Sequence, residues 1–203
     1  MLDVYKGLRR LGLNIDILPP DTADLSAYDL VLAPSLATIP APLMQAFAVH
    51  QSIALLGPRT DAKTAEFATP VPLPPALPGM ATVVARVESL PSGLTVPLAN
   101  GGHFLRWRVK LEGGSAREMT SDGWPALIAA GRLHYLAGWP DEAALARILT
   151  GLCANAGIEV EALPEALRKR SDGHWAYYFN FSAAPVAFRG VTVAAADFAI
   201  FPA

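Results

Sequence analysis

The feature that most constrains the fold is a set of short apolar runs, each of which leads into a loop built around proline or glycine. Leu32-Ala-Pro-Ser35, Leu56–Thr64 and Tyr135–Pro140 each follow or end such a run, which indicates the carboxyl end of a buried strand. In an α/β fold, ligands and chemistry gather at these ends. None of the three segments carries a nucleophile with a base beside it. The sequence therefore indicates an enzyme-like scaffold without catalytic residues, and it directs the search for function to assembly.

Helices and strands are expected to alternate through the first sixty residues. We expect a helix ending at Gly12, strands at 14–18, 29–33 and 52–56, and a second helix after Pro40. This alternation is typical of a doubly wound, largely parallel sheet. Such a sheet usually begins with a strand, so we expect a further strand upstream of Met1. In its absence, the strands at 14–18 and 29–33 should pair directly or borrow a strand, because unpaired interior backbone groups cost free energy.

The middle of the chain carries different signals. Five prolines within Pro70–Pro78 predict an extended surface excursion. Beyond it we expect strands at 82–88 and 103–111, a turn at Gly113-Gly114, a hairpin from 124 to 137 around Ala130-Gly131, and a helix from Pro140 to Gly157.

The chain is expected to form two domains, residues 1–162 and residues 163–203. The first would hold the α/β sheet. The second has a strand-only pattern, with strands expected at 167–171, 175–181, 186–189 and 191–200. A module of about forty residues is near the lower limit for independent folding, so we expect this β module to lean on the first domain.

Composition and charge exclude several classes of function. Hydrophobic residues make up 52% of the chain and charged residues 17%, which indicates a large buried fraction. The net charge of −2 comes without a basic stripe, so no nucleic-acid partner is expected. The longest apolar runs, such as Ile53–Leu56, are far too short to cross a bilayer, so no membrane partner is expected. The single cysteine, Cys153, excludes an internal disulfide. Because no disulfide calls for an oxidising compartment, the expected location is the cytoplasm.

The order of several motifs resembles a known family. These motifs are Leu8-Arg-Arg-Leu-Gly-Leu13, Ile15-Asp-Ile-Leu-Pro-Pro20, Asp24-Leu-Ser-Ala-Tyr28, Leu32–Ser35, Gly57–Thr64, Tyr135–Pro140 and Leu163-Pro-Glu165. Together they resemble the carboxyl-terminal half of family 42 glycoside hydrolases, which are bacterial β-galactosidases. The resemblance implies a flavodoxin-like, class I glutamine amidotransferase-like trimerisation domain followed by a small antiparallel β domain. It also implies that the catalytic barrel of the parent enzyme, with its catalytic glutamates, lies outside this chain.

A search for catalytic residues agrees with that implication. A retaining glycosidase needs two carboxyls about 5–5.5 Å apart. The glutamates are instead dispersed among helix starts, strand surfaces and loops, at positions 66, 88, 112, 118, 142, 159, 161 and 165. A degenerate amidotransferase-like hydrolase is one alternative, but the turn that would carry its thiol reads Gly57-Pro58-Arg59-Thr60. Cys153 is instead expected on the apolar face of a helix, packed in the protein core. No catalytic residue, cofactor-binding residue or metal ligand is therefore assigned, no cofactor is expected, and the isolated chain is not expected to hydrolyse β-galactosides.

Three further groups of residues carry weaker signals. Arg59, Thr60 and Lys63 at an expected helix start could cradle an anion, although capping and interface pairing are the stronger interpretation. The histidines, His50, His103, His134 and His174, lie far apart in sequence, which argues against a zinc site. An exposed row of aromatic side chains would instead favour a carbohydrate-binding accessory module, the candidates being Trp107, Trp124, Trp139, Trp175, Tyr177 and Tyr178.

The expected function is thus noncatalytic self-association, with a homotrimer favoured by the resemblance. The expected partners are further copies of the chain and the parent catalytic barrel. Pro70–Pro78 and Arg59–Lys63 are the expected contact regions, because both project from strand ends and neither contributes obvious core residues.

Overall fold

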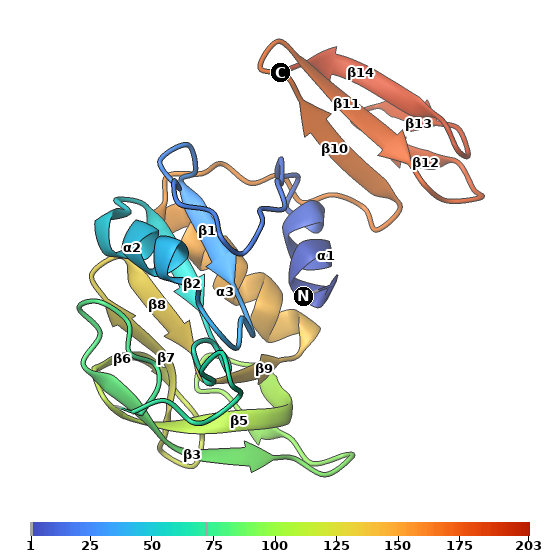
Figure 1. Cartoon of the computed structure of the whole chain (residues 1–203). Helices are drawn as coiled ribbons and strands as arrows, with labels where there is room; N and C mark the ends of the chain where they lie inside the picture. The colour runs from blue at the N-terminus through green and yellow to red at the C-terminus, as the bar shows by residue number, and fades with distance from the viewer. Residues whose placement is uncertain (1, 72) are drawn as a thin grey trace. The chain divides into compact units, whose positions relative to one another are not determined.

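The computed structural model describes residues 2–71 and 73–203, which form two compact units (Figure 1). A five-stranded mixed sheet forms the centre of the larger unit, Leu18–Gly157. The smaller unit combines Met1–Ile17 with Ile158–Ala203. Packing thus groups the first residues with the last ones. The domain boundary expected after Ala162 stays a prediction.

The central sheet contains both parallel and antiparallel strands. Its order is β1 (Leu30–Ala33), β2 (Ile53–Leu56), β8 (Leu133–Leu136), β7 (Pro125–Ala130) and β6 (Ser115–Met119). The first three strands are parallel, whereas β7 is antiparallel to both β8 and β6. The expected hairpin around Ala130-Gly131 is confirmed, with Gly131 at a φ of +60°. A tight turn can join only antiparallel strands, so this hairpin is the reason why the sheet is mixed and not largely parallel.

Two helices pack on this sheet, and both begin where the sequence predicts. Helix α2 (Ala41–Val49) follows Pro40 and buries Leu43, Ala46 and Phe47. Helix α3 (Glu142–Asn155) is capped by Asp141, whose carboxylate accepts a 2.8 Å hydrogen bond from the Ala144 backbone N–H. Together with the strands they enclose one apolar core. No helix among residues 2–71 and 73–203 is long and apolar enough to span a membrane.

A second sheet of the larger unit is built on the long strand β5 (His103–Gly113). Strand β3 (Thr82–Ser89) pairs with it antiparallel, as do the short strands β4 (Val96–Pro97) and β9 (Gly138–Pro140). These strands confirm the ones expected at 82–88 and 103–111. The expected Gly113-Gly114 turn is also confirmed, because both glycines have a positive φ, of +77° and +75°.

The smaller unit combines helix α1 (Leu2–Arg10) with short antiparallel sheets. Strands β10 (Leu167–Ser171), β11 (Trp175–Asn180) and β14 (Phe198–Pro202) form one sheet, and β12 (Val186–Phe188) pairs with β13 (Val191–Val193). The single strand expected over 191–200 is wrong. It is divided into β13 and β14, and Ala196 between them has a φ of +51°, which interrupts the extended backbone.

Glu161 ties the smaller unit together. Its Oε2 accepts a 2.6 Å hydrogen bond from the Tyr178 hydroxyl and lies 3.1 Å from Lys169 Nζ, while its Oε1 lies 2.6 Å from Arg189 Nη2. Burial, followed by the hydrogen bond to Glu161, raises the pKa of Tyr178 to about 12. The phenol therefore stays a hydrogen-bond donor throughout the neutral range.

The strand expected at 14–18 is wrong, and so is its expected pairing with the next strand. These residues form no strand, and Ile17 is 84% exposed. The Asn14 side chain instead bonds the backbone of Ser171 in both directions, donating to its carbonyl at 2.8 Å and accepting from its N–H at 3.0 Å. The amide group thus supplies the pairing of a strand residue without a strand, and β1 pairs within the central sheet with β2.

An ionic cluster centred on Arg108 joins β3, β5 and the turn after β6. Arg108 donates from Nε to Glu88 at 2.8 Å and from Nη1 to Asp122 at 2.7 Å, and Lys110 Nζ lies 2.9 Å from Glu88. The Arg108 guanidinium holds the pKa of Asp122 far below its usual range, and Lys110 contributes most to lowering the pKa of Glu88. The Arg108 side chain is only 7% exposed, so its carboxylate partners depend on it for compensation.

Replacing Arg108 with methionine is expected to lower the free energy of unfolding by about 2–4 kcal/mol, because Glu88 and Asp122 would lose a largely buried counterion. The matched control is Arg86→Met, since Arg86 also faces Glu88 but is 70% exposed and 3.6 Å away. That control should cost at most about 0.5 kcal/mol. Urea denaturation of both variants measures the difference, and equal losses would contradict the role assigned to Arg108.

Candidate functional site

The three segments singled out in the sequence meet along one edge of the central sheet. Strands β1, β2 and β8 are parallel neighbours, so the loops that follow Ala33, Leu56 and Leu136 leave the sheet on the same side (Figure 1). The expectation that each segment marks the carboxyl end of a buried strand is therefore confirmed. This edge is the place where an α/β fold would hold a ligand or a catalytic group.

The buried hydroxyl of Thr60 joins the first two loops. It donates a 2.8 Å hydrogen bond to the Ala33 carbonyl and accepts a 2.7 Å hydrogen bond from the Gly57 N–H. Thr60 is completely buried. Two backbone bonds extend the connection, from Asp61 N–H to the Leu36 carbonyl and from Lys63 N–H to the Ala37 carbonyl, each 2.9 Å long. The loop after β2 is thereby fixed against the loop after β1.

Gly57 allows the same loop to approach β8. Its φ is +77°, and a Cβ at this position would lie 2.4 Å from the Leu136 carbonyl oxygen and 2.9 Å from the Tyr135 ring. Such distances are far below van der Waals contact, so no residue with a side chain fits here. The loop backbone therefore packs directly against the end of β8 at Gly57.

The anion cradle considered for Arg59, Thr60 and Lys63 lacks its structural basis. No helix begins there, since the next regular element of the described chain after β2 is strand β3. The dipole and the N–H groups of a first helical turn, which would attract an anion, are therefore missing from this described part of the chain. The Thr60 hydroxyl is already bonded within the fold, and the Arg59 guanidinium lies over the Trp107 ring at 4.8 Å.

The groups with nucleophilic chemistry are likewise held within the fold. Burial raises the pKa of the Cys153 thiol, and Cys153 is completely buried on α3, which agrees with its expected packing role. Burial also raises the pKa of the Tyr135 phenol. Both groups are therefore protonated and poorly nucleophilic at neutral pH. Ser35 is exposed at the end of β1 with a φ of +58°.

Carboxylates and histidines do not gather at this edge. Half of the eight glutamates considered have basic partners elsewhere: Glu88 with Arg108, Glu118 with Arg147, Glu161 with Lys169, and Glu165 with Arg10. His103 lies 3.2 Å from Asp141, and His134 bonds the Arg132 carbonyl. Within the part of the chain that the structure describes, no group of three or more histidine, cysteine, aspartate or glutamate side chains could hold a metal ion.

The six aromatic candidates are divided between the two units. Trp107 and Trp139 are half-buried, with ring centroids 5.7 Å apart, and Lys110 covers Trp124 at 4.9 Å. Tyr178 is buried. The alternation of β11 instead presents Trp175, Tyr177 and Phe179 on the opposite face of that strand, where Phe179 lies 5.8 Å from Phe198 of β14. Trp175 and Phe198 are each about half exposed, at 49% and 51%.

Sequence reasoning missed one prominent residue. Phe67 is 75% exposed, and its φ is +61°, which is uncommon for a bulky side chain. No periodicity surrounds it that could have separated an exposed phenylalanine from a core one. The Pro70–Pro78 segment differs from expectation in another way, because its Pro75 and Leu77 are buried and Leu77 belongs to the core. This segment is therefore an anchored loop and not a free excursion.

Comparison with known proteins gives one consistent family. A model of the β-galactosidase trimerisation domain matches residues 1–159. Over 185 residues the chain is 41% identical to a β-galactosidase from Thermus thermophilus, an alignment that covers 87% of this chain and 28% of that protein. It is 27% identical over 212 residues to the β-galactosidase Bga of Halorubrum lacusprofundi, covering 88% and 30%. The chain thus spans 28% to 30% of the length of these curated relatives.

Solved structures agree with the sequence comparison. The β-galactosidase of the psychrophilic Marinomonas ef1 matches with a TM-score of 0.90 and 29% identity, covering 99% of this chain and 33% of that one. The β-galactosidase of Bacillus circulans sp. alkalophilus matches with a TM-score of 0.77 and 17% identity, covering 99% and 35%, which shows the shared fold alone.

Replacing Thr60 with valine is expected to lower the free energy of unfolding by about 2–3 kcal/mol, because the Gly57 N–H and the Ala33 carbonyl would stay buried without their partner. Thr60→Ser is the control, since it keeps the hydroxyl and removes one methyl group, at about 1 kcal/mol. Chemical denaturation of the two variants measures the difference. A serine variant as damaged as the valine variant would show that packing, and not the hydroxyl, fixes the two loops.

Proposed function

The chain belongs to the β-galactosidase trimerisation domain family of glycoside hydrolase family 42, and we propose that it holds the subunits of a β-galactosidase together as a homotrimer without doing chemistry itself. The observation that carries this proposal is the match of residues 1–159 to a domain named for trimerisation. The packing at the sheet edge supports it, because Gly57 and Thr60 close the place where a catalytic group would stand.

The chemistry of the parent enzyme is assigned to a part that this chain does not contain. The relatives named as β-galactosidases are about three times as long, with 28% of the Thermus protein aligned. We propose that their catalytic glutamates belong to a barrel outside the aligned part, that this barrel is a second partner of the chain, and that the assembly acts on β-galactosides in the cytoplasm. The glutamates described above support this, since their partners are lysine and arginine and not a second carboxyl.

The finer fold assignment is also a proposal. We propose that the larger unit is a flavodoxin-like, class I glutamine amidotransferase-like domain in which the thiol-bearing turn is replaced by Gly57-Pro58-Arg59-Thr60. The parallel trio β1-β2-β8 and the sharp turn after β2, with Arg59 at a φ of +65°, support this assignment. The replacement of a thiol by a buried, bonded threonine argues against a degenerate hydrolase.

A carbohydrate-binding accessory role is the second candidate. One observation favours it, namely the partly exposed row formed by Trp175, Tyr177 and Phe179 of β11 beside Phe198 of β14. Flat aromatic faces of this kind can stack on the apolar face of a pyranose ring. The row lies on the smaller unit, so this role would be compatible with assembly through the larger one.

Sedimentation equilibrium tests the assembly proposal directly. At micromolar concentrations we expect a species of three times the 21.5 kDa monomer mass, because a closed three-fold ring buries the same apolar surface in every subunit. A species that remains a 21.5 kDa monomer at every concentration would reject trimerisation by this chain alone.

Titration with a β-galactooligosaccharide tests the second candidate. Binding should quench the fluorescence of Trp175, and Trp175→Ala should abolish binding without changing the sedimentation of the protein, because Trp175 belongs to the other unit. Trp107→Phe is the control for quenching, since Trp107 stacks within the larger unit. An unchanged spectrum at millimolar sugar would reject the carbohydrate role.

A further inference from the structure

A rigid, exposed aromatic side chain projects from the larger unit. Phe67 is the one exposed aromatic residue in the described part of Leu18–Gly157. Its loop is fixed by hydrogen bonds from Phe67 N–H to the Thr64 carbonyl at 3.0 Å, from Ala68 N–H to the Thr64 hydroxyl at 3.2 Å, and from the Thr38 hydroxyl to the Lys63 carbonyl at 3.0 Å. Left-handed backbone at a phenylalanine persists only where the surroundings enforce it. The loop therefore holds an apolar ring in solvent, with the 96% exposed Val71 following it.

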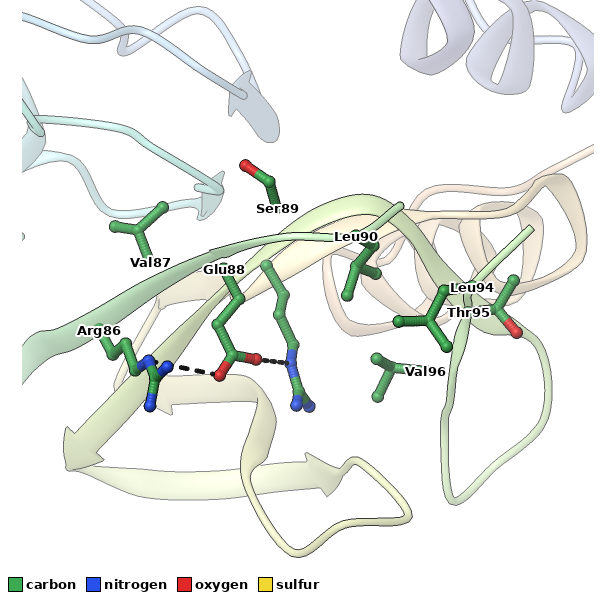
Figure 2. Close-up of a pocket in the computed structure, with 9 residues that line it drawn as sticks. Arg86, Val87, Glu88, Ser89, Leu90, Leu94, Thr95 and Val96 are labelled. Carbon is green, nitrogen blue, oxygen red and sulfur yellow. Dashed lines mark hydrogen bonds and ion pairs between the residues drawn. The ribbon is translucent and has the colours of Figure 1, made fainter. Parts of the chain in front are cut away.

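A hollow with one apolar side and one charged side lies elsewhere on the same unit. It has a volume of about 490 Å³ and is lined by residues of β3, of β4, of the loop between them and of β5. Figure 2 shows that Leu90, Leu94 and Val96 converge on this space from one side, while Glu88 faces it from the other. Leu94 is 54% exposed at its mouth.

The opposite wall of the hollow suits an aromatic ring better than an aliphatic side chain. It is formed by Arg86 and Arg108 with Glu88 between them. Arg108 is held by its carboxylate partners, whereas the Arg86 side chain is 70% exposed and able to lie over an inserted ring. A ring seated here would contact leucine side chains on one face and a guanidinium on the other.

We propose that Phe67 of one subunit inserts into the hollow at Leu94 of the next subunit in the trimer. This inference rests on the proposed function and names the contact that would hold neighbouring subunits of the trimer together. A three-fold ring needs a heterologous contact, in which two different patches of the same chain meet. Phe67 and the hollow are two such patches, and both lie inside the region matched to the trimerisation domain.

Charge complementarity supports a second copy of this chain as the occupant. Glu66, exposed directly beside Phe67, would reach the rim of the neighbouring hollow, where the exposed Arg86 lies. A carboxylate and a guanidinium would thus meet beside the inserted ring. Opposite charges at the rim of an interface chiefly fix its register and speed association.

Two single substitutions test the two halves of the contact. Phe67→Asn removes the ring with a residue that tolerates a positive φ, and Leu94→Glu places a charge at the mouth of the hollow beside Glu88. Each should weaken trimerisation by at least about thirtyfold in sedimentation velocity experiments, as expected for a central anchor. Val49→Ser is the control, because Val49 is 71% exposed on the same unit outside both patches. It should trimerise like the unchanged protein, and thermal unfolding should show all variants to be folded.

Mixing the two variants gives the decisive result. The Phe67→Asn protein keeps an intact hollow and the Leu94→Glu protein keeps an intact ring, so together they can form one contact but cannot close a ring. An equimolar mixture should therefore form a one-to-one heterodimer at a concentration at which each variant alone is mainly monomeric. If the unchanged chain trimerises while either variant still trimerises, or if the mixture forms no dimer, this inference is overturned and the proposed function stands. If the unchanged chain is a monomer, the proposed function fails and this inference fails with it.

Discussion

The close packing of the loop after β2 against its two neighbours is the constraint on which the larger unit depends. Gly57 allows the backbone to pass within contact of the Leu136 carbonyl, and the Thr60 hydroxyl bonds the loop after β1. The next residues continue this attachment through backbone bonds to Leu36 and Ala37. Because the parallel strands end at one edge, a buried threonine and a glycine three residues before it can together connect three loops that lie far apart in sequence.

The same packing supports the proposal that this edge of an enzyme-like sheet holds no catalytic group. A catalytic turn at this position must leave an exposed nucleophile, free N–H groups and room for a substrate. Here the hydroxyl is bonded internally, the Gly57 N–H bonds that hydroxyl, and the Arg59 side chain lies over Trp107. The groups that would bind an intermediate in an enzyme thus stabilise the fold instead.

Local sequence rules predicted the helix starts and turns that depend on neighbouring residues. They failed for strands and loops whose conformation depends on contacts with residues far away in the sequence. Pro40, Asp141 and the Ala130-Gly131 pair mark helix starts and a hairpin through capping and turn chemistry, and all three appear in the structure. Residues 14–18 have the alternation of a strand but form none, because the Asn14 side chain bonds the backbone of Ser171. Sequence periodicity does not reveal such a side-chain contact. The segment 191–200 is interrupted at Ala196, where an alanine adopts a positive φ that its own preference would not predict. At the sheet edge the three loops were predictable, whereas Phe67 and the burial of Leu77 depend on long-range packing.

The cluster around Arg108 contributes to the stability of the fold and lines the proposed contact between subunits. Glu88 is held by Arg108 and Lys110, which fixes β3 against β5, and the same Glu88 and Arg108 form one wall of the hollow. The wall therefore exists before any partner arrives, as does the strained Phe67 loop. Ordering flexible groups on association costs free energy, and prefolded patches avoid much of that cost. A contact between two such patches can be strong although few side chains take part, which is what a small domain needs if it is to close a ring of larger subunits.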